Sequence, residues 1–190
     1  MQLWVGLGNP GASYALNRHN VGFMALDTIA AVHDFTAPQK KFQGWLQEGR
    51  IGGVKVLLLK PATFMNESGR SVSEALRFYK LDPDALTVFH DELDLAAFKV
   101  KARIGGGLAG HNGLRSIDQH AGPEFRRVRI GIGHPGHKDR VTGYVLGNYA
   151  KAELDPLADM LGAIAAEAGW LAKADDARFM SDLALRLADD

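Results

Sequence analysis

Apolar residues of this chain gather in short runs of the length of β-strands. Four such runs cover residues 3–7, 54–59, 86–89 and 128–132, and β-branched residues are frequent in the last three. Helical spacing of apolar residues follows in five further segments, namely residues 20–32, 67–79, 112–120, 151–172 and 176–187. Because strands are interleaved with helices, the pattern predicts an α/β sandwich whose sheet is largely buried between helices.

The segment of residues 36–60 contains no convincing helix, and Gly52 and Gly53 separate two strand-like parts of it. It therefore predicts a β-hairpin, which would make the sheet mixed rather than all parallel. A length of 190 residues, with 46% apolar and 23% charged residues, is ordinary for one globular domain, and no repeat or linker divides the chain. We expect a single domain over residues 1–190 that ends in the helices of residues 151–190.

The composition excludes several kinds of site. Without cysteine, the chain has no disulfide, no thiolate metal site and no cysteine nucleophile. The beginning, MQLWVGLGNPG, is typical of a first strand rather than an export signal, and no run approaches the roughly 20 apolar residues that span a bilayer. These features favour a cytoplasmic protein without a membrane partner.

The charge is zero overall but unevenly distributed. Residues 99–140 carry nine Lys/Arg against three Asp/Glu, whereas residues 151–190 carry four against nine. The basic stretch indicates either a local surface that faces phosphates or a solvated face that the acidic tail balances.

The segment GLGNPGASYALNRHNVG near the N-terminus contains a possible nucleotide fingerprint. Gly6, Gly8 and Gly11 fit the spacing G-x-G-x-x-G after a strand. A dinucleotide site needs its helix to begin inside the fingerprint, but here a loop with a proline follows, so we rank this interpretation low. Asn9 and His19 would instead lie at the carboxyl edge of the sheet, where α/β folds bind ligands.

Two later segments place polar residues where a strand ends. In KPATFMNESG, Asn66 either binds a peptide-like group or, like Ser68, caps the following helix. In HDELDL, Asp91 can orient a histidine by accepting its hydrogen bond. The alternative there is a divalent cation held by His90, Asp91 and Asp94, but no metal-ligand motif supports it.

The segment RIGGGLAGHNGLRSI combines a glycine run with a predicted helix start at Asn112. It lacks the Lys and Ser/Thr of a phosphate-binding Walker loop, since His111 and Asn112 follow the last glycine of the run. The glycines then predict a sharply bent or mobile turn, with Asn112 either capping the helix or lining a site.

Six fragments in this order resemble the bacterial-type peptidyl-tRNA hydrolase family, namely GLGNPG, NRHNVGF, PATFMNESG, HDELDL, GGGLAGHNGLRSI and RVRIGIGHPG. The resemblance spans about residues 3–148. It implies that the protein hydrolyses the ester between a peptide and the 3′ ribose of tRNA, releasing both, and that peptidyl-tRNA is its partner.

The resemblance also implies roles for particular residues. His19 would be the catalytic base and Asp91 its orienting carboxylate, with Asn9 beside them in the catalytic machinery. The implied substrate-binding residues of the cleft are Tyr14, Phe64, Met65, Asn66, His111 and Asn112. Arg103 and Arg129 would contact tRNA phosphate, and His134 would border a mobile lid of residues 134–148.

The implied reaction needs neither a metal ion nor a cofactor. Histidine, with a reference pKa of about 6.5, is largely neutral near pH 7 and can take a proton from water. The resemblance favours a monomer, and a non-catalytic RNA-binding protein with the same fold stays an alternative. The sequence departs from the family pattern at two places. Leu108-Ala109 stand where relatives often have small or polar residues and glycine, and Glu67 replaces a commonly apolar residue.

Overall fold

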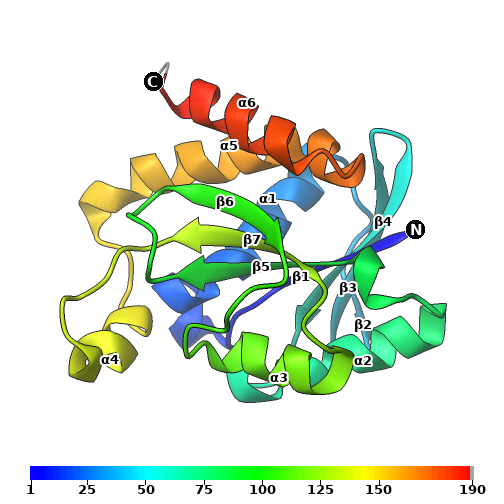
Figure 1. The fold of residues 1–190 in the computed structure, drawn as a ribbon, viewed down its shortest axis with the longest axis horizontal. Coiled ribbons are helices and arrows are strands. Elements are labelled where there is room, and N and C mark those ends of the chain that lie inside the picture. The colour runs from blue at the N-terminus through cyan, green and yellow to red at the C-terminus, as the bar shows by residue number, and fades with distance from the viewer. Residues whose placement is uncertain (189–190) are drawn as a thin grey trace.

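The computed structural model describes residues 1–188 and contains a seven-stranded mixed sheet between two layers of helices (Figure 1). The strands are β1 (Gln2–Gly6), β2 (Gln39–Lys41), β3 (Gly44–Ile51), β4 (Val54–Pro61), β5 (Leu86–Glu92), β6 (Val100–Ile104) and β7 (Arg126–Gly131). The helices are α1 (Val21–Val32), α2 (Ser68–Tyr79), α3 (Asn112–Ala121), α4 (Val141–Val145), α5 (Leu154–Ala172) and α6 (Asp176–Ala188). Short 3-10 turns, such as those at Arg18–Asn20 and Met65–Glu67, introduce several helices.

The strands lie in the order β2-β3-β4-β1-β5-β7-β6. Strands β4, β1, β5 and β7 run parallel, while β2, β3 and β6 pair in the antiparallel direction. The predicted hairpin is confirmed as β3–β4, and Gly52 and Gly53 turn it with positive φ angles of 56° and 80°. The prediction of a mixed, largely buried sheet is therefore correct.

Two hydrophobic cores lie on opposite faces of the sheet. Side chains of a strand alternate between its faces, so Trp4 packs into one core, while Leu3 and Val5 pack into the other. Helices α1, α5 and α6 cover the face of Trp4, and α2 and α3 cover the opposite face (Figure 1). Strand β5 is buried along its whole length, as its central place in the sheet requires.

Most predicted elements are confirmed to within a few residues, but three were missed. Strands β2 and β6 were not predicted, and α4 lies inside the expected lid of residues 134–148, for which no helix was predicted. The expectation of a domain to residue 190 includes residues 189–190, which lie outside the described part. No helix of residues 1–188 has the length and apolar character needed to cross a membrane.

The nucleotide fingerprint does not have the required geometry. Helix α1 begins at Val21, ten residues after the last glycine of the fingerprint, so its N-terminus is not part of the glycine loop. Gly6 serves packing instead, because a Cβ atom there would lie 2.4 Å from the carbonyl oxygen of Gly22 in α1. The spacing of the glycines therefore reflects contact between strand and helix.

Candidate active site

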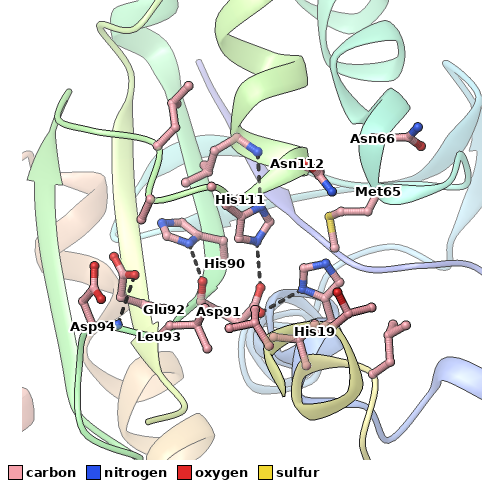
Figure 2. Close-up of a pocket in the computed structure, with 18 of the residues that line it drawn as sticks. His19, Met65, Asn66, His90, Asp91, Glu92, Leu93, Asp94, His111 and Asn112 are labelled. Atoms are coloured by element: carbon pink, nitrogen blue, oxygen red, sulfur yellow. Dashed lines mark hydrogen bonds and ion pairs between the residues drawn. The ribbon is translucent and has the colours of Figure 1, made fainter. Parts of the chain in front are cut away.

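A cavity of about 610 Å³ lies where the parallel strands end (Figure 2). Because carboxyl ends of parallel strands meet at one edge of a sheet, segments far apart in the sequence converge there. The loop after β1 contributes Asn9, the turn before α1 contributes His19, and β5 contributes Asp91. The start of α3 contributes His111 and Asn112.

His19 and Asp91 form the hydrogen bond that the sequence predicted. Nδ1 of His19 donates to Oδ2 of Asp91 over 2.8 Å, and the carboxylate is buried. With Nδ1 protonated, Nε2 of a neutral His19 has a free lone pair, and this nitrogen has no hydrogen-bond partner within residues 1–188. His19 is therefore arranged as a proton acceptor in the cavity.

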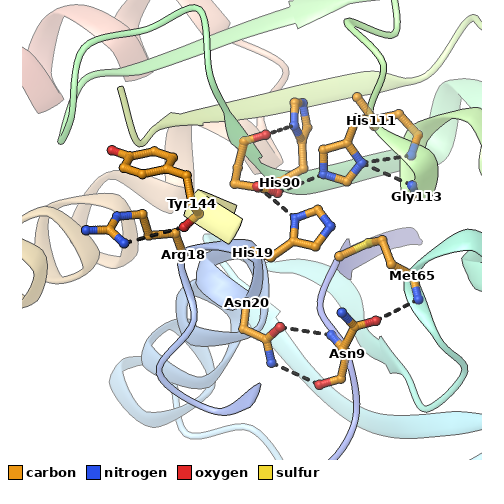
Figure 3. Close-up of polar contacts among 11 residues, drawn as sticks. Asn9, Arg18, His19, Asn20, Met65, His90, His111, Gly113 and Tyr144 are labelled. Atoms are coloured by element: carbon orange, nitrogen blue, oxygen red, sulfur yellow. Dashed lines mark hydrogen bonds and ion pairs between the residues drawn. The ribbon is translucent and has the colours of Figure 1, made fainter. Parts of the chain in front are cut away.

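His111 occupies the other oxygen of the same carboxylate. Its Nδ1 accepts hydrogen bonds from the backbone N–H groups of Gly113 and Leu114, at 3.1 Å and 3.3 Å. The proton must then be on Nε2, which donates to Oδ1 of Asp91 over 2.7 Å. His111 thus caps α3 and helps to hold Asp91, so of the two alternatives for Asn112 the one in which it caps this helix is wrong (Figure 3).

Asn9 is fixed in one orientation by three hydrogen bonds. Its Oδ1 accepts from the backbone N–H of Met65 over 2.8 Å, so its amide nitrogen is the end left to donate. The backbone of Asn9 exchanges two hydrogen bonds of 2.9 Å with the side chain of Asn20 (Figure 3). The arrangement leaves the Asn9 amide as a rigid hydrogen-bond donor in the cavity wall.

The electrostatics of the site depend on one buried negative charge. Burial of Asp91 opposes its ionised form, but the neighbouring His19 and His111 outweigh this effect and hold its pKa below the usual range. Burial of His19 lowers its pKa, yet the charge of Asp91 and the hydrogen bond to it produce a net increase above the ordinary value. The carboxylate therefore favours the protonated, imidazolium form of His19.

The metal alternative made of His90, Asp91 and Asp94 is not the group that the fold brings together. His90 uses Nδ1 to donate to the backbone carbonyl of Asp91, and burial, followed by the neighbouring His111, lowers its pKa to about 3. Possible ligand atoms of His19, Asp91 and His111 do lie within 4.8 Å of one another. Their separations of 2.7 and 2.8 Å are hydrogen-bond lengths, so a cation would have to displace both bonds.

The expected lid segment is attached to the residue next to His19. The guanidinium of Arg18 donates to the carbonyl of Asn148 over 3.2 Å and to Glu153 over 3.0 Å, and it stacks on the ring of Tyr144 at 4.4 Å. Residues of α4 line the cavity together with His134. The mobility of this segment stays a prediction.

The remaining predicted residues divide into two groups. Five line the cavity as expected, namely Phe64, Met65, Asn66, Asn112 and His134. Tyr14 lies in the turn Ala12–Tyr14 and is not among the described residues that line the cavity. Arg103 and Arg129 lie on β6 and β7, beyond the cavity wall.

Helix α2 lacks the side-chain cap that was expected of Asn66 or Ser68. The Ser68 hydroxyl donates to the carbonyl of Met65 rather than accepting from a helix N–H group, and no side chain caps α2. Asn66 is exposed and lines the cavity, which leaves its amide accessible to a ligand.

The sequence did not reveal one supporting residue and one supporting contact. Asn20 fixes Asn9, and its position directly after His19 in RHN was the available signal. The hydrogen bond from His111 to Asp91 was not foreseen either, although a histidine directly before a helix can replace the usual capping oxygen with its Nδ1.

Comparison with known proteins identifies the family of this chain. A family model described as peptidyl-tRNA hydrolase matches residues 3–188. The chain belongs to the peptidyl-tRNA hydrolase family. A peptidyl-tRNA hydrolase of Rhizorhabdus wittichii is 77% identical, with 100% of each chain covered. One of Novosphingobium aromaticivorans is 78% identical over 98% of this chain and 97% of its own.

The fold comparison gives the same result. The crystal structure of peptidyl-tRNA hydrolase from Acinetobacter baumannii matches with a TM-score of 0.90 and 40% identity, covering 96% of this chain and 94% of that chain. At Leu108-Ala109, the first departure expected from the resemblance, Leu108 packs against the core and Ala109 has a positive φ of 49°. Glu67, the other departure, is exposed and pairs with Arg70.

Proposed function

We propose that this peptidyl-tRNA hydrolase uses His19 to activate water for attack on the ester between peptide and tRNA. The observation that supports this mechanism is the buried hydrogen bond between His19 Nδ1 and Asp91, with Nε2 left for a water molecule. A positioned base of this kind contributes roughly 10²- to 10⁴-fold to a rate.

The steps follow from the chemistry of an ester. Water donates a hydrogen bond to Nε2 of His19 and attacks the carbonyl carbon, while His19 takes the proton. The amide nitrogen of Asn9 donates to the oxyanion that forms, an interaction worth about 10²- to 10³-fold. The intermediate then collapses, the bond to the 3′ ribose oxygen breaks, and His19 returns its proton to that oxygen. The products are a free peptide acid and tRNA.

The other amides of the cavity suit the peptide main chain. Asn66 and Asn112 line the cavity and can each donate and accept hydrogen bonds, which matches the donor and acceptor of a peptide unit. Recognition of the main chain makes the enzyme tolerant of peptide sequence. No step requires a metal ion or cofactor, because a ribose alkoxide leaves an ester far more easily than an amine leaves an amide.

The tRNA would lie along the basic edge of the sheet. Arg103 on β6 and Arg129 on β7 have side chains on the same face of neighbouring strands, and Lys101 pairs with Arg129 across them. Arg129 also donates to Glu92 over 2.9 Å, so a phosphate would share or replace that partner. We expect phosphate contacts here to position the substrate and to weaken with salt.

One chain supplies every residue of the proposed site, so the enzyme is expected to act as a monomer. Its substrate forms on ribosomes, which places its work in the cytoplasm. A non-catalytic RNA-binding protein would bind tRNA without cleaving the ester. The contact between His19 and Asp91 favours the enzyme, because RNA binding alone does not need it.

The decisive experiment measures peptide release from N-acetyl-aminoacyl-tRNA by the wild-type chain and by His19→Ala. The variant should lose at least 10²-fold in kcat while its affinity for tRNA stays unchanged. Free aminoacyl-tRNA serves as control and should be a much poorer substrate. Release at the wild-type rate by His19→Ala would remove this residue from the mechanism, and binding without any cleavage by the wild type would favour the RNA-binding alternative.

A further inference from the structure

A second cavity, of about 260 Å³, shares Asn9 with the catalytic cavity but is otherwise lined by different residues. Its walls come from the loop after β1, from helix α1, and from strands β3 and β4. Six residues define it best, namely Pro10, Phe23, Met24, Trp45, Lys60 and Pro61. The cavity is therefore a separate space that begins where the catalytic residues end.

The lining of this second cavity suits an uncharged, apolar group. Trp45 and Phe23 supply aromatic rings, and Met24 adds a polarisable side chain. The two charged side chains, Asp27 and Lys60, lie within 2.5 Å of each other and cancel. A phosphate would find no free positive charge among these lining residues.

Trp45 is 43% exposed although it belongs to a strand within the sheet. A large aromatic side chain left open to water beside a cavity marks a place where another molecule can bury it. Trp45 pairs with Lys60 across β3 and β4, so its backbone belongs to the sheet rather than to a loop. One wall of the cavity is therefore a partly exposed aromatic side chain that a regular strand carries.

The order of the strands indicates which part of the substrate reaches this cavity. The basic residues that we assign to tRNA phosphates lie on β6 and β7, at one side of the catalytic pair. Strands β3 and β4 lie on the other side. At about 4.8 Å per strand, the three strand positions from β4 to β7 span about 14 Å, with the reacting ester between them. With tRNA on the side of β7, the peptide extends toward β4.

We propose that this second cavity is a subsite for a large apolar or aromatic side chain from the C-terminal end of the peptide. The inference rests on the proposed function. It adds a preference among peptides to a cleft whose asparagines recognise only the main chain. Asn9 joins the two spaces, since it donates to the reacting carbonyl on one side and forms the rim of the subsite on the other.

The test uses one tRNA carrying three N-acetyl dipeptides: glycyl-glycyl, phenylalanyl-glycyl and glycyl-phenylalanyl. For the wild type, KM should be about tenfold lower for at least one phenylalanine-containing peptide than for glycyl-glycyl. Trp45→Ala should remove this advantage, with kcat and the KM for glycyl-glycyl unchanged. Trp45→Phe should restore part of it.

The matched control is Phe78→Ala, because Phe78 is an exposed aromatic residue on α2 that does not line either cavity. It should leave all three KM values unchanged. Equal KM values for the three peptides in the wild type would overturn the subsite. So would a Trp45→Ala variant that weakens all three substrates and peptide-free tRNA alike, since that result assigns the cavity to RNA. A wild type that hydrolyses none of the three would refute the proposed function itself, which is a different result.

Discussion

At the scale of single residues, Asp91 determines how the site responds to pH. It is the one carboxylate to which both His19 and His111 donate, and it raises the pKa of His19 despite burial of that ring. Below this pKa the imidazole is protonated and cannot accept a proton from water. We therefore expect kcat/KM to rise with pH and to reach half its plateau above pH 6.5, the ordinary value for histidine. A profile of kcat/KM over pH 5 to 9 measures this, and a midpoint below that value would contradict it.

Asp91→Asn should lower the pKa of His19 instead of raising it. The amide has no charge to favour the imidazolium, whereas the burial that lowers the pKa of His19 remains. The midpoint of the kcat/KM profile should then move to lower pH, and kcat should fall by about 10³- to 10⁴-fold because the imidazolium loses its partner. Circular dichroism checks that the variant folds. A midpoint that moves upward would show that another group controls the titration.

At the scale of elements, the fit of helix α1 on the sheet sets the position of His19. A Cβ atom on Gly22 would lie 2.3 Å from the Phe89 carbonyl oxygen and 2.6 Å from the Leu7 nitrogen. Gly22→Ala must push the start of α1 away from β5, and His19 with it. We expect a loss of about 1–3 kcal/mol in the free energy of unfolding and a fall in kcat.

The comparison for this prediction is Gly162→Ala in α5, where no atom lies within 4 Å of the added methyl group. An alanine in this open helical position should stabilise the protein by about 0.5–1 kcal/mol and leave kcat unchanged. Denaturant unfolding measures the free energy of unfolding of both variants, and steady-state kinetics measures their kcat. Equal effects of the two substitutions would mean that contact of α1 with the sheet does not position His19.

Substitutions of His111, at the N-terminus of α3, can separate its role as helix cap from its role as hydrogen-bond partner of Asp91. His111→Ala removes both the helix cap and the hydrogen bond to Asp91, whereas His111→Asn restores a cap but is too short to replace the imidazole at Asp91. Both variants should lower kcat, and the alanine variant should be about 0.5–2 kcal/mol less stable than the asparagine variant, because it alone lacks the cap. Thermal unfolding beside kinetics distinguishes them. Full activity of either variant would show that His19 alone suffices to hold Asp91.

The elements were largely predictable, because long apolar runs and helical spacing report burial directly. Strand β6 was not, since VKARI buries only Val100 and Ala102 and depends on pairing with the distant β7. In the site, the pairing of His19 with Asp91 was predicted from the resemblance and from the position of both residues at the carboxyl edge of the sheet. The hydrogen bond from His111 did not, because its glycine-rich context predicted only a turn.

At the scale of the whole molecule, the fold concentrates the positive charge of residues 99–140. Lys101, Arg103, Arg127 and Arg129 come together on neighbouring strands at one edge of the sheet. Two of these side chains already have partners within the protein. Arg129 pairs with Glu92, and Arg127 is buried and donates to the Gly107 carbonyl over 2.7 Å. Of the three arginines, Arg103 is the exposed one and has the most accessible guanidinium.

Removal of charge at Arg103 and Arg129 should raise KM for full-length peptidyl-tRNA more than for a short aminoacyl-nucleotide fragment. If two to four phosphates are contacted, binding of tRNA should weaken with salt with a logarithmic slope of about −1.5 to −3, and the double variant should flatten it. Arg186→Ala is the control, since Arg186 pairs with Glu167 on the helices α5 and α6. An equal rise of KM for both substrates would defeat the assignment to phosphate.

The contact of residues 17–18 with residues 147–148 has a consequence for folding during synthesis. Asn17 forms an isolated bridge with Asn148, and the backbone N–H of Arg18 donates to the Gly147 carbonyl beside it. The turn that carries His19 thus gains these two contacts only after more than three quarters of the polypeptide has been translated. A chain that ends before residue 147 lacks both contacts, and we expect it to hold this turn, and His19 with it, less rigidly.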